Sequence, residues 1–370
     1  MSTLIASNLQ ASGGTGTAAL LSSVNGGPIS GTRNRIINGD MRIDQRNNGA
    51  SMSTASGSSA YTLDRWTIEY SQFSKLTLQQ NTGAVTPPVG YTNYLGVTSS
   101  SAYSAISTDY FLLEQRVEGF NSADLAWGTT SALTITVSFW VRSSLTGTFG
   151  GAIRNQAGTL SYPFSFTINA ASTWEKKTVT IPGETSGTWL TNNSIGLRLA
   201  LSLGMGSAYT ATAGAWAAGN YLAPTGTVSV VGTSGATFYI TGVQLEPGTV
   251  ATPFERRSYG QELALCQRYY EQSFDGTNPA SSPGGIMAFN ANGGTNTASL
   301  QAMFKVTKRA TPTVTVFSNA TGTSGVIRDN SGADRAATVQ LVGTNSAQFT
   351  NAVAGSVANY SAQYTASAEL

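Results

Sequence analysis

The stretch Asn34-Arg-Ile-Ile-Asn-Gly-Asp-Met-Arg-Ile-Asp-Gln-Arg46 opens the folded part of this 370-residue chain. A second stretch, Phe238-Tyr-Ile-Thr-Gly-Val-Gln-Leu-Glu-Pro-Gly-Thr-Val-Ala-Thr-Pro-Phe-Glu-Arg256, closes it. Both alternate apolar and polar side chains, which is the pattern of strands with one buried face. The two stretches therefore predict one β-domain over residues 36–256, with its first strand at 35–45 and its last at 236–245.

The composition favours an all-β protein. The chain contains 41 Gly, only 10% of its residues are charged, and Gly, Ser, Thr and Asn break its apolar runs into short pieces. Such spacing is typical of β-sandwiches rather than helical bundles. The clearest alternation, in residues 134–142, places Ile135 and Phe139 on one face and Trp140 on the other. About eight to ten such segments predict a two-sheet jelly roll.

Four regions follow from the pattern: an extended segment over 1–35, the jelly roll over 36–256, a connecting amphipathic helix within 257–274, and a smaller C-terminal β-sandwich over 275–370. Residues 1–32 hold no charged and no aromatic side chain. The helix is predicted by a Ser258 cap and by a helical repeat of apolar side chains, Tyr259, Leu263, Cys266 and Tyr270. This stripe needs a partner, which is either the domain's own sheet or the helices of sister chains.

Several function classes are excluded or disfavoured by composition. The chain has no histidine, which removes Ser-His-Asp triads, Cys-His dyads and histidine metal sites. Its net charge is +2 without a basic cluster, so nucleic-acid binding is not expected. No apolar run approaches the roughly 18 residues of a membrane helix, and no signal peptide is visible. The single cysteine, Cys266, agrees with synthesis in a reducing cytoplasm.

The order of several short segments resembles a known family. Tyr61-Thr-Leu-Asp-Arg-Trp66, Leu113-Glu-Gln-Arg-Val-Glu-Gly119 and Val243-Gln-Leu-Glu-Pro-Gly248, followed by Ala251-Thr-Pro-Phe-Glu-Arg256, resemble successive parts of a jelly roll. That domain, similar to carbohydrate-binding modules, occurs in many bacteriophage fibre and virion-surface proteins. The opening Met1-Ser-Thr-Leu-Ile-Ala-Ser-Asn-Leu-Gln10 also resembles phage-fibre N-termini.

The resemblance implies a homotrimeric tail fibre on a virion assembled in the host cytoplasm. Residues 1–35 would attach it to other virion proteins, and the rest would contact polysaccharide on the host surface during adsorption. It also implies a structural Ca²⁺ near the first and last strands, where Asp40 and Glu246 supply oxygen ligands. No other cofactor and no catalytic residue is expected.

Aromatic side chains are the candidates for glycan contact, because sugars stack their apolar faces on rings. Residues 204–227 lack a strand period and predict a long loop, so its Tyr209, Trp216 and Tyr221 are the first choices. Trp140 is next, since it shares a face with Thr and Ser.

Three alternatives stay open. The first is a purely structural protein, either a head-decorating fibre or a tail spacer. The second is a polysaccharide depolymerase that uses two carboxylates drawn from Asp109, Glu114, Glu118 and Asp124. The third is a cellular carbohydrate-binding module, which the absence of a signal sequence and of a catalytic partner domain disfavours.

Overall fold

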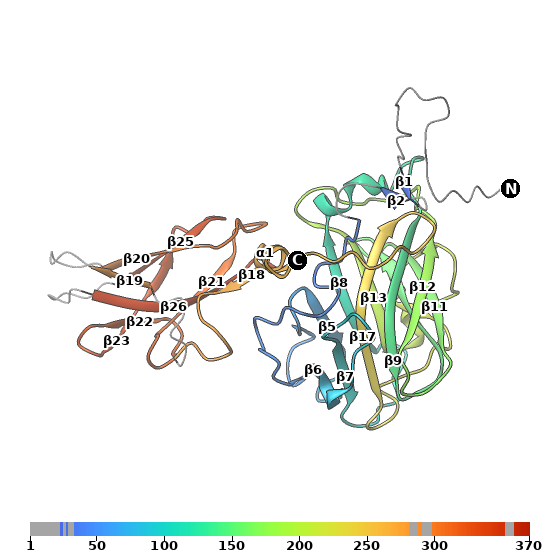
Figure 1. The fold of residues 1–370 in the computed structure, drawn as a ribbon, viewed down its shortest axis with the longest axis horizontal. Coiled ribbons are helices and arrows are strands. Elements are labelled where there is room, and N and C mark those ends of the chain that lie inside the picture. Colours follow the sequence, from blue (N-terminus) through green and yellow to red (C-terminus); the bar gives the residue numbers. More distant parts are fainter. Residues whose placement is uncertain (1–22, 25–26, 29–32, 281–286, 291–297, 352–358) are drawn as a thin grey trace, which may run out of the picture.

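The computed structural model describes residues 23–24, 27–28, 33–280, 287–290, 298–351 and 359–370. It consists of a large β-sandwich and a smaller β-domain, with the only α-helix of the described residues at the junction between them (Figure 1). Of the predicted segment 1–35, the described residues include only 33–35 and the short paired strands β1 (Ser23–Val24) and β2 (Gly27–Pro28). No helix in the described residues is long and apolar enough to cross a membrane.

The large sandwich is built from two antiparallel sheets. The seven-stranded sheet has the order β15 (Ala217–Ala218), β11 (Leu160–Ile168), β10 (Gly147–Arg154), β13 (Ile195–Met205), β8 (Tyr110–Glu118), β5 (Trp66–Tyr70) and β4 (Ser59–Tyr61). The six-stranded sheet has the order β12 (Glu175–Ile181), β9 (Ile135–Ser143), β17 (Thr237–Pro247), β7 (Leu95–Ser99), β6 (Leu76–Gln80) and β3 (Met52–Ser53). This confirms the jelly-roll β-sandwich.

The core lies between the two sheets and follows the two-residue period of the strands. Ile135, Phe139 and Leu199 are among its fully buried members, each with no exposed surface. Burial of such a side chain stabilises the fold by roughly 1.5–3 kcal/mol. Because these residues point inward, the alternate positions of each strand, such as Arg198 on β13, point to the outer faces of the sandwich.

The opening stretch is not a strand, so that prediction is wrong. Residues 33–46 have irregular backbone, and Asn38 and Met41 lie in the left-handed region with φ of 57° and 60°. The apolar side chains are nevertheless buried, including Ile36 and Met41. The Asn38 amide holds the loop by donating to the carbonyls of Ile43 and Asp64. Alternation alone did not distinguish a buried, side-chain-bonded loop from a strand.

Short elements decorate the sandwich. They are the 3-10 turns η1 (Thr82–Ala84), η2 (Gly119–Asn121), η3 (Ala123–Leu125) and η4 (Ser207–Tyr209), and the parallel pair β14 (Thr210–Ala211) and β16 (Ala223–Pro224). Three of these belong to the predicted 204–227 loop, which crosses the outer face of the seven-stranded sheet.

The helix α1 (Tyr259–Gln267) is shorter than the predicted stripe requires. Ser258 caps it as expected, by accepting from the Gln261 main-chain N–H. Its buried side chains are Glu262, Cys266 and Gln267, whereas Tyr259 is 57% exposed. Tyr270 lies beyond the helix in a strand, so the four-residue stripe does not exist as one face. Glu262 is buried because its carboxylate accepts from Arg257.

The smaller domain has two sheets. One contains β18 (Tyr270–Gln272), β19 (Met287–Asn290), β21 (Thr313–Phe317), β22 (Val326–Asp329), β23 (Asp334–Ala336) and β26 (Asn359–Ser367), and the other β20 (Ala298–Met303), β24 (Thr338–Gln340) and β25 (Ser346–Asn351). β18 pairs with β26, so this domain begins at residue 270 and not at 275. Fully or nearly fully buried Leu300, Val316 and Phe349 belong to its own core.

Charged side chains join the two domains. The Glu118 carboxylate of β8 accepts from Arg268, at 2.6 and 3.0 Å, and from the Tyr269 hydroxyl. Near the end of the chain, Glu369 pairs with Arg46 and Arg65 of the sandwich. Figure 1 places α1 and the last residues of the chain side by side at this junction.

Candidate functional site

The four predicted aromatic residues lie in three different places. Trp140 lies on the outer face of the six-stranded sheet, where it is half-buried beside the side chain of Tyr91. Trp216 lies at one end of the sandwich. Only Tyr209 and Tyr221 share a surface, the outer face of the seven-stranded sheet. The structure therefore does not form one platform from all four rings.

Trp216 belongs to a cluster of three indole rings. Its ring centroid lies 5.4 Å from that of Trp127 and 5.6 Å from that of Trp189, both edge to face. The three indole N–H groups donate to main-chain carbonyls of Pro182, Leu133 and Ser186. These rings pack against the core. Trp216 thus closes the end of the sandwich.

A cavity of about 280 Å³ adjoins this cluster, between η3 and the segment around Trp189. Trp127, Trp189 and Leu125 line it together with small apolar and hydroxyl residues, and no charged side chain does so. Because the indole N–H groups are already used, it offers apolar contact and few directional hydrogen bonds.

The outer face of the seven-stranded sheet combines aromatic and charged groups. The loop 207–226 crosses this face, where Leu222 packs on Leu112 of β8 and Ala200 of β13. Tyr209 packs edge to face on Tyr110 of β8, with ring centroids 5.6 Å apart, and both rings are half-buried.

Two further loop residues lie over the same face. The Asn220 side-chain oxygen accepts from Arg154 at 2.7 Å, and the main-chain N–H of Tyr221 donates to the Ser161 hydroxyl. We call the set Glu69, Tyr110, Glu114, Arg116, Arg154, Arg198, Tyr209, Asn220 and Tyr221 the outer-face site.

Glu114 is the centre of this site. Its side chain has no exposed surface, and its carboxylate pairs with Arg154 at 2.5 Å, Arg116 at 2.9 Å and Arg198 at 3.1 Å. Burial opposes its ionisation, but the three guanidinium groups outweigh burial and lower the pKa of Glu114 to about 2. Glu114 is therefore a fixed anion that holds the three arginine side chains in place.

Glu69 shares the same cations but is more accessible, with a side chain 16% exposed and Arg116 at 2.5 Å. Burial and the neighbouring Glu114 raise the pKa of Glu69, against the opposing effect of Arg116. Two nearby carboxylates with pKa values moved in opposite directions are a pattern of acid–base sites. Here the more acidic carboxylate is enclosed by three arginines, so it cannot reach a substrate.

The other carboxylates proposed for a depolymerase are also engaged. Asp109 accepts from Ser71 and Tyr103, both at 2.7 Å. Glu118 is held at the domain junction, and Asp124 pairs with Arg35. Glu114 and Glu118 do share the outer face of one strand, but each is fixed by a different set of partners.

The two calcium ligands suggested by sequence already have protein partners. Asp40 is 4% exposed and forms an ion pair with Arg42 at 2.5 Å. Glu246 is fully buried and accepts from Thr252 and Gln244. In the part of the chain that the structure describes, no group of three or more Asp, Glu or Cys side chains gathers into a possible metal site. The calcium site stays a prediction.

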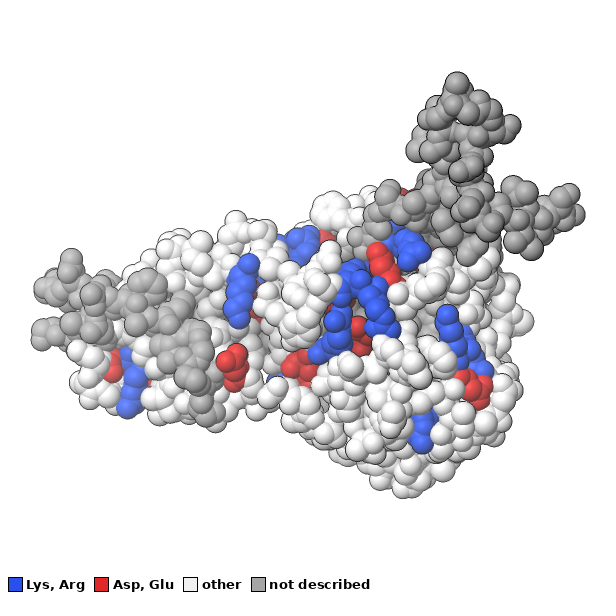
Figure 2. Space-filling view, in the orientation of Figure 1, with Lys and Arg blue, Asp and Glu red and all other residues white. Residues whose placement is uncertain are grey.

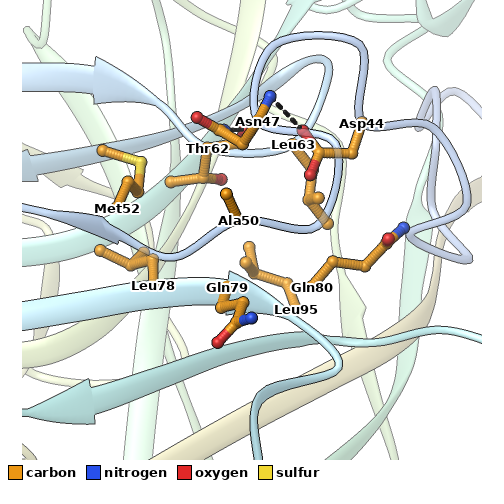
Figure 3. A pocket seen from close by; sticks show the side chains of 10 residues that line it. All are labelled: Asp44, Asn47, Ala50, Met52, Thr62, Leu63, Leu78, Gln79, Gln80 and Leu95. Carbon is orange, nitrogen blue, oxygen red and sulfur yellow. Dashed lines mark hydrogen bonds between the residues drawn. The ribbon is translucent and has the colours of Figure 1, made fainter. Parts of the chain in front are cut away.

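Two other surface features lack the shape or charge of a site. A narrow depression beneath residues 44–52 is shown in Figure 3, where Asp44 and Asn47 are joined by a hydrogen bond at its rim. It has no room for a water molecule. Figure 2 shows one face of the molecule, on which charged side chains form small groups of mixed sign separated by uncharged surface.

Sequence reasoning missed the charged part of the outer-face site. Its signal was present in the strands: Arg198 interrupts the apolar run Ile195-Gly-Leu-Arg-Leu-Ala-Leu201, at a position that alternation places outside the core. What the pattern lacked was the register that brings Arg116, Arg154 and Arg198 together.

The sequence matches no protein-family model, and no curated protein matches it. Among solved structures, it is similar to a family 22 xylan-binding module of Paenibacillus barcinonensis, with 14% identity, a TM-score of 0.26, and coverage of 55% of this chain and 99% of the module. A family 11 carbohydrate-binding module of Clostridium thermocellum, in complex with a β-1,3-1,4-mixed-linked tetrasaccharide, has 14% identity, a TM-score of 0.26, and coverage of 55% and 96%.

A tailspike protein of bacteriophage CBA120 is also similar, with 10% identity and a TM-score of 0.28. There the match covers 53% of this chain but only 21% of the tailspike. The sheet topology itself defines the chain as a jelly-roll β-sandwich protein.

Proposed function

We propose that this chain is a non-catalytic glycan-binding protein that contacts saccharide through the outer-face site. The observation that carries the proposal is the placement of Tyr110 and Tyr209 beside a fixed set of charged groups on one sheet face, with the main chain of Tyr221 over the same face. Half-exposed rings offer apolar surface to a sugar ring, while arginine, carboxylate and amide groups bond its hydroxyls. The enclosure of Glu114 favours binding over hydrolysis.

Binding to a panel of neutral and acidic polysaccharides, measured by affinity gel electrophoresis and calorimetry, tests the proposal. Tyr209→Ala and Tyr221→Ala are expected to lower the affinity about tenfold each. Tyr259→Ala is the matched control, because that ring is 57% exposed on α1, outside the site. Absence of binding to every polysaccharide, or equal affinity of all three variants and the wild type, would refute it.

We further propose that the protein is a virion fibre that attaches through residues 1–35 and acts in host adsorption. The support is the phage-fibre resemblance of Met1–Gln10 and of residues 251–256, and the uncharged composition of residues 1–32. Linked copies would convert weak glycan contacts into avidity. Light scattering of the full chain is expected to give a trimer, 3 × 38.4 kDa or about 115 kDa. A mass near 38.4 kDa would contradict an autonomous trimer.

A further inference from the structure

Three arginines form a single row across the seven-stranded sheet. In the register of the strands, Arg154 of β10 lies opposite Arg198 of β13, and Arg198 lies opposite Arg116 of β8. Neighbouring strands are about 4.8 Å apart, so the row brings three like charges together. Two carboxylates, Glu69 and Glu114, face them.

The hydrogen-bond donors of the row are used unequally. All three nitrogens of the Arg116 guanidinium have acceptors: Glu114, Glu69 and the main-chain oxygen of Leu370. Arg198, by contrast, makes one hydrogen bond to the described residues, from Nη1 to Glu114 at 3.1 Å. The Nε atoms of Arg198 and Arg154 are both buried, and neither has a hydrogen-bond partner among the described residues. Arg198 is therefore the cation with the most unused donors.

The charged form of the Arg198 side chain is destabilised by its surroundings, and the side chain is partly accessible. Burial lowers the pKa of Arg198, and Arg154 and Arg116 lower it further, against the opposing effect of Glu114. The Arg198 side chain is 17% exposed, similar to Arg116 at 19% and Glu69 at 16%. A further anion beside Arg198 would relieve the repulsion within the row and accept from its unbonded Nη2.

We propose that this arginine row selects an acidic saccharide, whose carboxylate binds Arg198 and is flanked by Arg154 and Arg116. This inference rests on the proposed glycan-binding function and adds the chemical class of its ligand. The planar fork of arginine matches a carboxylate, and such charge-assisted bonds are stronger than those to neutral hydroxyls. One guanidinium with unused donors, Arg198, fits one carboxylate per contacted sugar, and not the run of phosphates of a nucleic acid.

The test compares one polysaccharide with and without its charge. Calorimetry on the full chain would use polygalacturonate and its methyl-esterified form, with alginate and a sulfated glucan as further probes. Stronger binding of the carboxylate forms than of the ester is expected, and Arg198→Gln should weaken that binding about tenfold while leaving affinity for the ester unchanged. Arg142→Gln is the matched control, because Arg142 lies on the six-stranded sheet and contacts Ser172 and Tyr239.

The outcomes separate the two proposals. Equal binding of the acid and its ester, a preference for the sulfated glucan over both carboxylate polymers, or full affinity in Arg198→Gln would overturn the acidic-saccharide inference while glycan binding stands. Binding to no polysaccharide at all would overturn both. The fluorescence melting curve of Arg198→Gln serves to show that any lost affinity does not reflect unfolding.

Discussion

Replacing Glu114 by Gln tests whether one buried carboxylate holds the outer-face site together. The side chain has no exposed surface and serves three arginines. In the folded protein its pKa is about 2, compared with an ordinary 4.5, and 2.5 units correspond to about 3 kcal/mol. Removal of one partner from a buried ion cluster costs a similar amount, about 3–5 kcal/mol. For a domain of this size, that loss lowers the melting temperature by roughly 6–12 °C.

The assay uses the distribution of tryptophan. All six Trp lie between residues 66 and 216, so intrinsic fluorescence reports the jelly roll and not the C-terminal domain. Asp124→Asn is the control, since its side chain is 56% exposed and its ion pair with Arg35 is a surface pair worth no more than about 1 kcal/mol. A Glu114→Gln protein that melts within about 2 °C of the wild type would refute the reasoning.

The pH dependence follows from the same carboxylate. Its pKa is depressed in the folded state, so its contribution is fully present above the unfolded value near 4.5 and is lost as the pH falls toward about 2. Wild-type stability should therefore decline between those pH values. The decline should be shallower in Glu114→Gln, because that variant has no proton to bind there.

Three further predictions concern other parts of the chain. Lys308→Met should destabilise the C-terminal domain by about 3 kcal/mol, because it leaves the fully buried Glu271 without its cation. Adding Glu271→Gln should recover part of that loss, and hydrogen exchange of β26 measures both effects. Gly242→Ala should cost about 1–3 kcal/mol in the fluorescence melt, because φ is +62° and a Cβ would lie 2.6 Å from the Tyr91 hydroxyl, whereas Gly260→Ala on α1, with nothing within 4 Å, should not destabilise. Arg309→Ala removes the bonds to Asn193, Ala368 and Glu369, so small-angle scattering should show a wider range of interdomain distances; an unchanged scattering profile would count against this role.

The two-residue period of apolar side chains predicted most of the fold. Residues 134–142 became β9 with the predicted faces, and the closing stretch became β17. The same two-residue period wrongly predicted a strand at residues 33–46. There, side-chain hydrogen bonds from Asn38 hold a loop in place of the hydrogen bonds between paired strands. At the helix the apolar pattern succeeded only in part: Leu263 and Cys266 pack with Ile37 and Ile43, but Glu262 is buried as well, because Arg257 compensates its charge.

The site was predicted less well than the fold, because a site depends on register. Tyr209 and Tyr221 were predicted from the composition of their loop, and the structure places the main chain of both over one sheet face, but their contact with a glycan stays a prediction. Trp216 was misplaced because composition cannot show that its ring packs on Trp127 and Trp189. The arginine row joins residues 116, 154 and 198, and only the strand order of the sheet makes them neighbours.

The junction gives the C-terminal domain two tethers. β18 enters it from α1, and β26 leaves it toward Glu369, which returns to Arg46 and Arg65 of the sandwich. Because these two strands are hydrogen-bonded neighbours, a pull on the far end of this domain is shared between adjacent strands and reaches the sandwich at two points. A single flexible linker would let the domain rotate freely, and that linker alone would bear the whole force. The double attachment therefore limits rotation of the C-terminal domain relative to the sandwich.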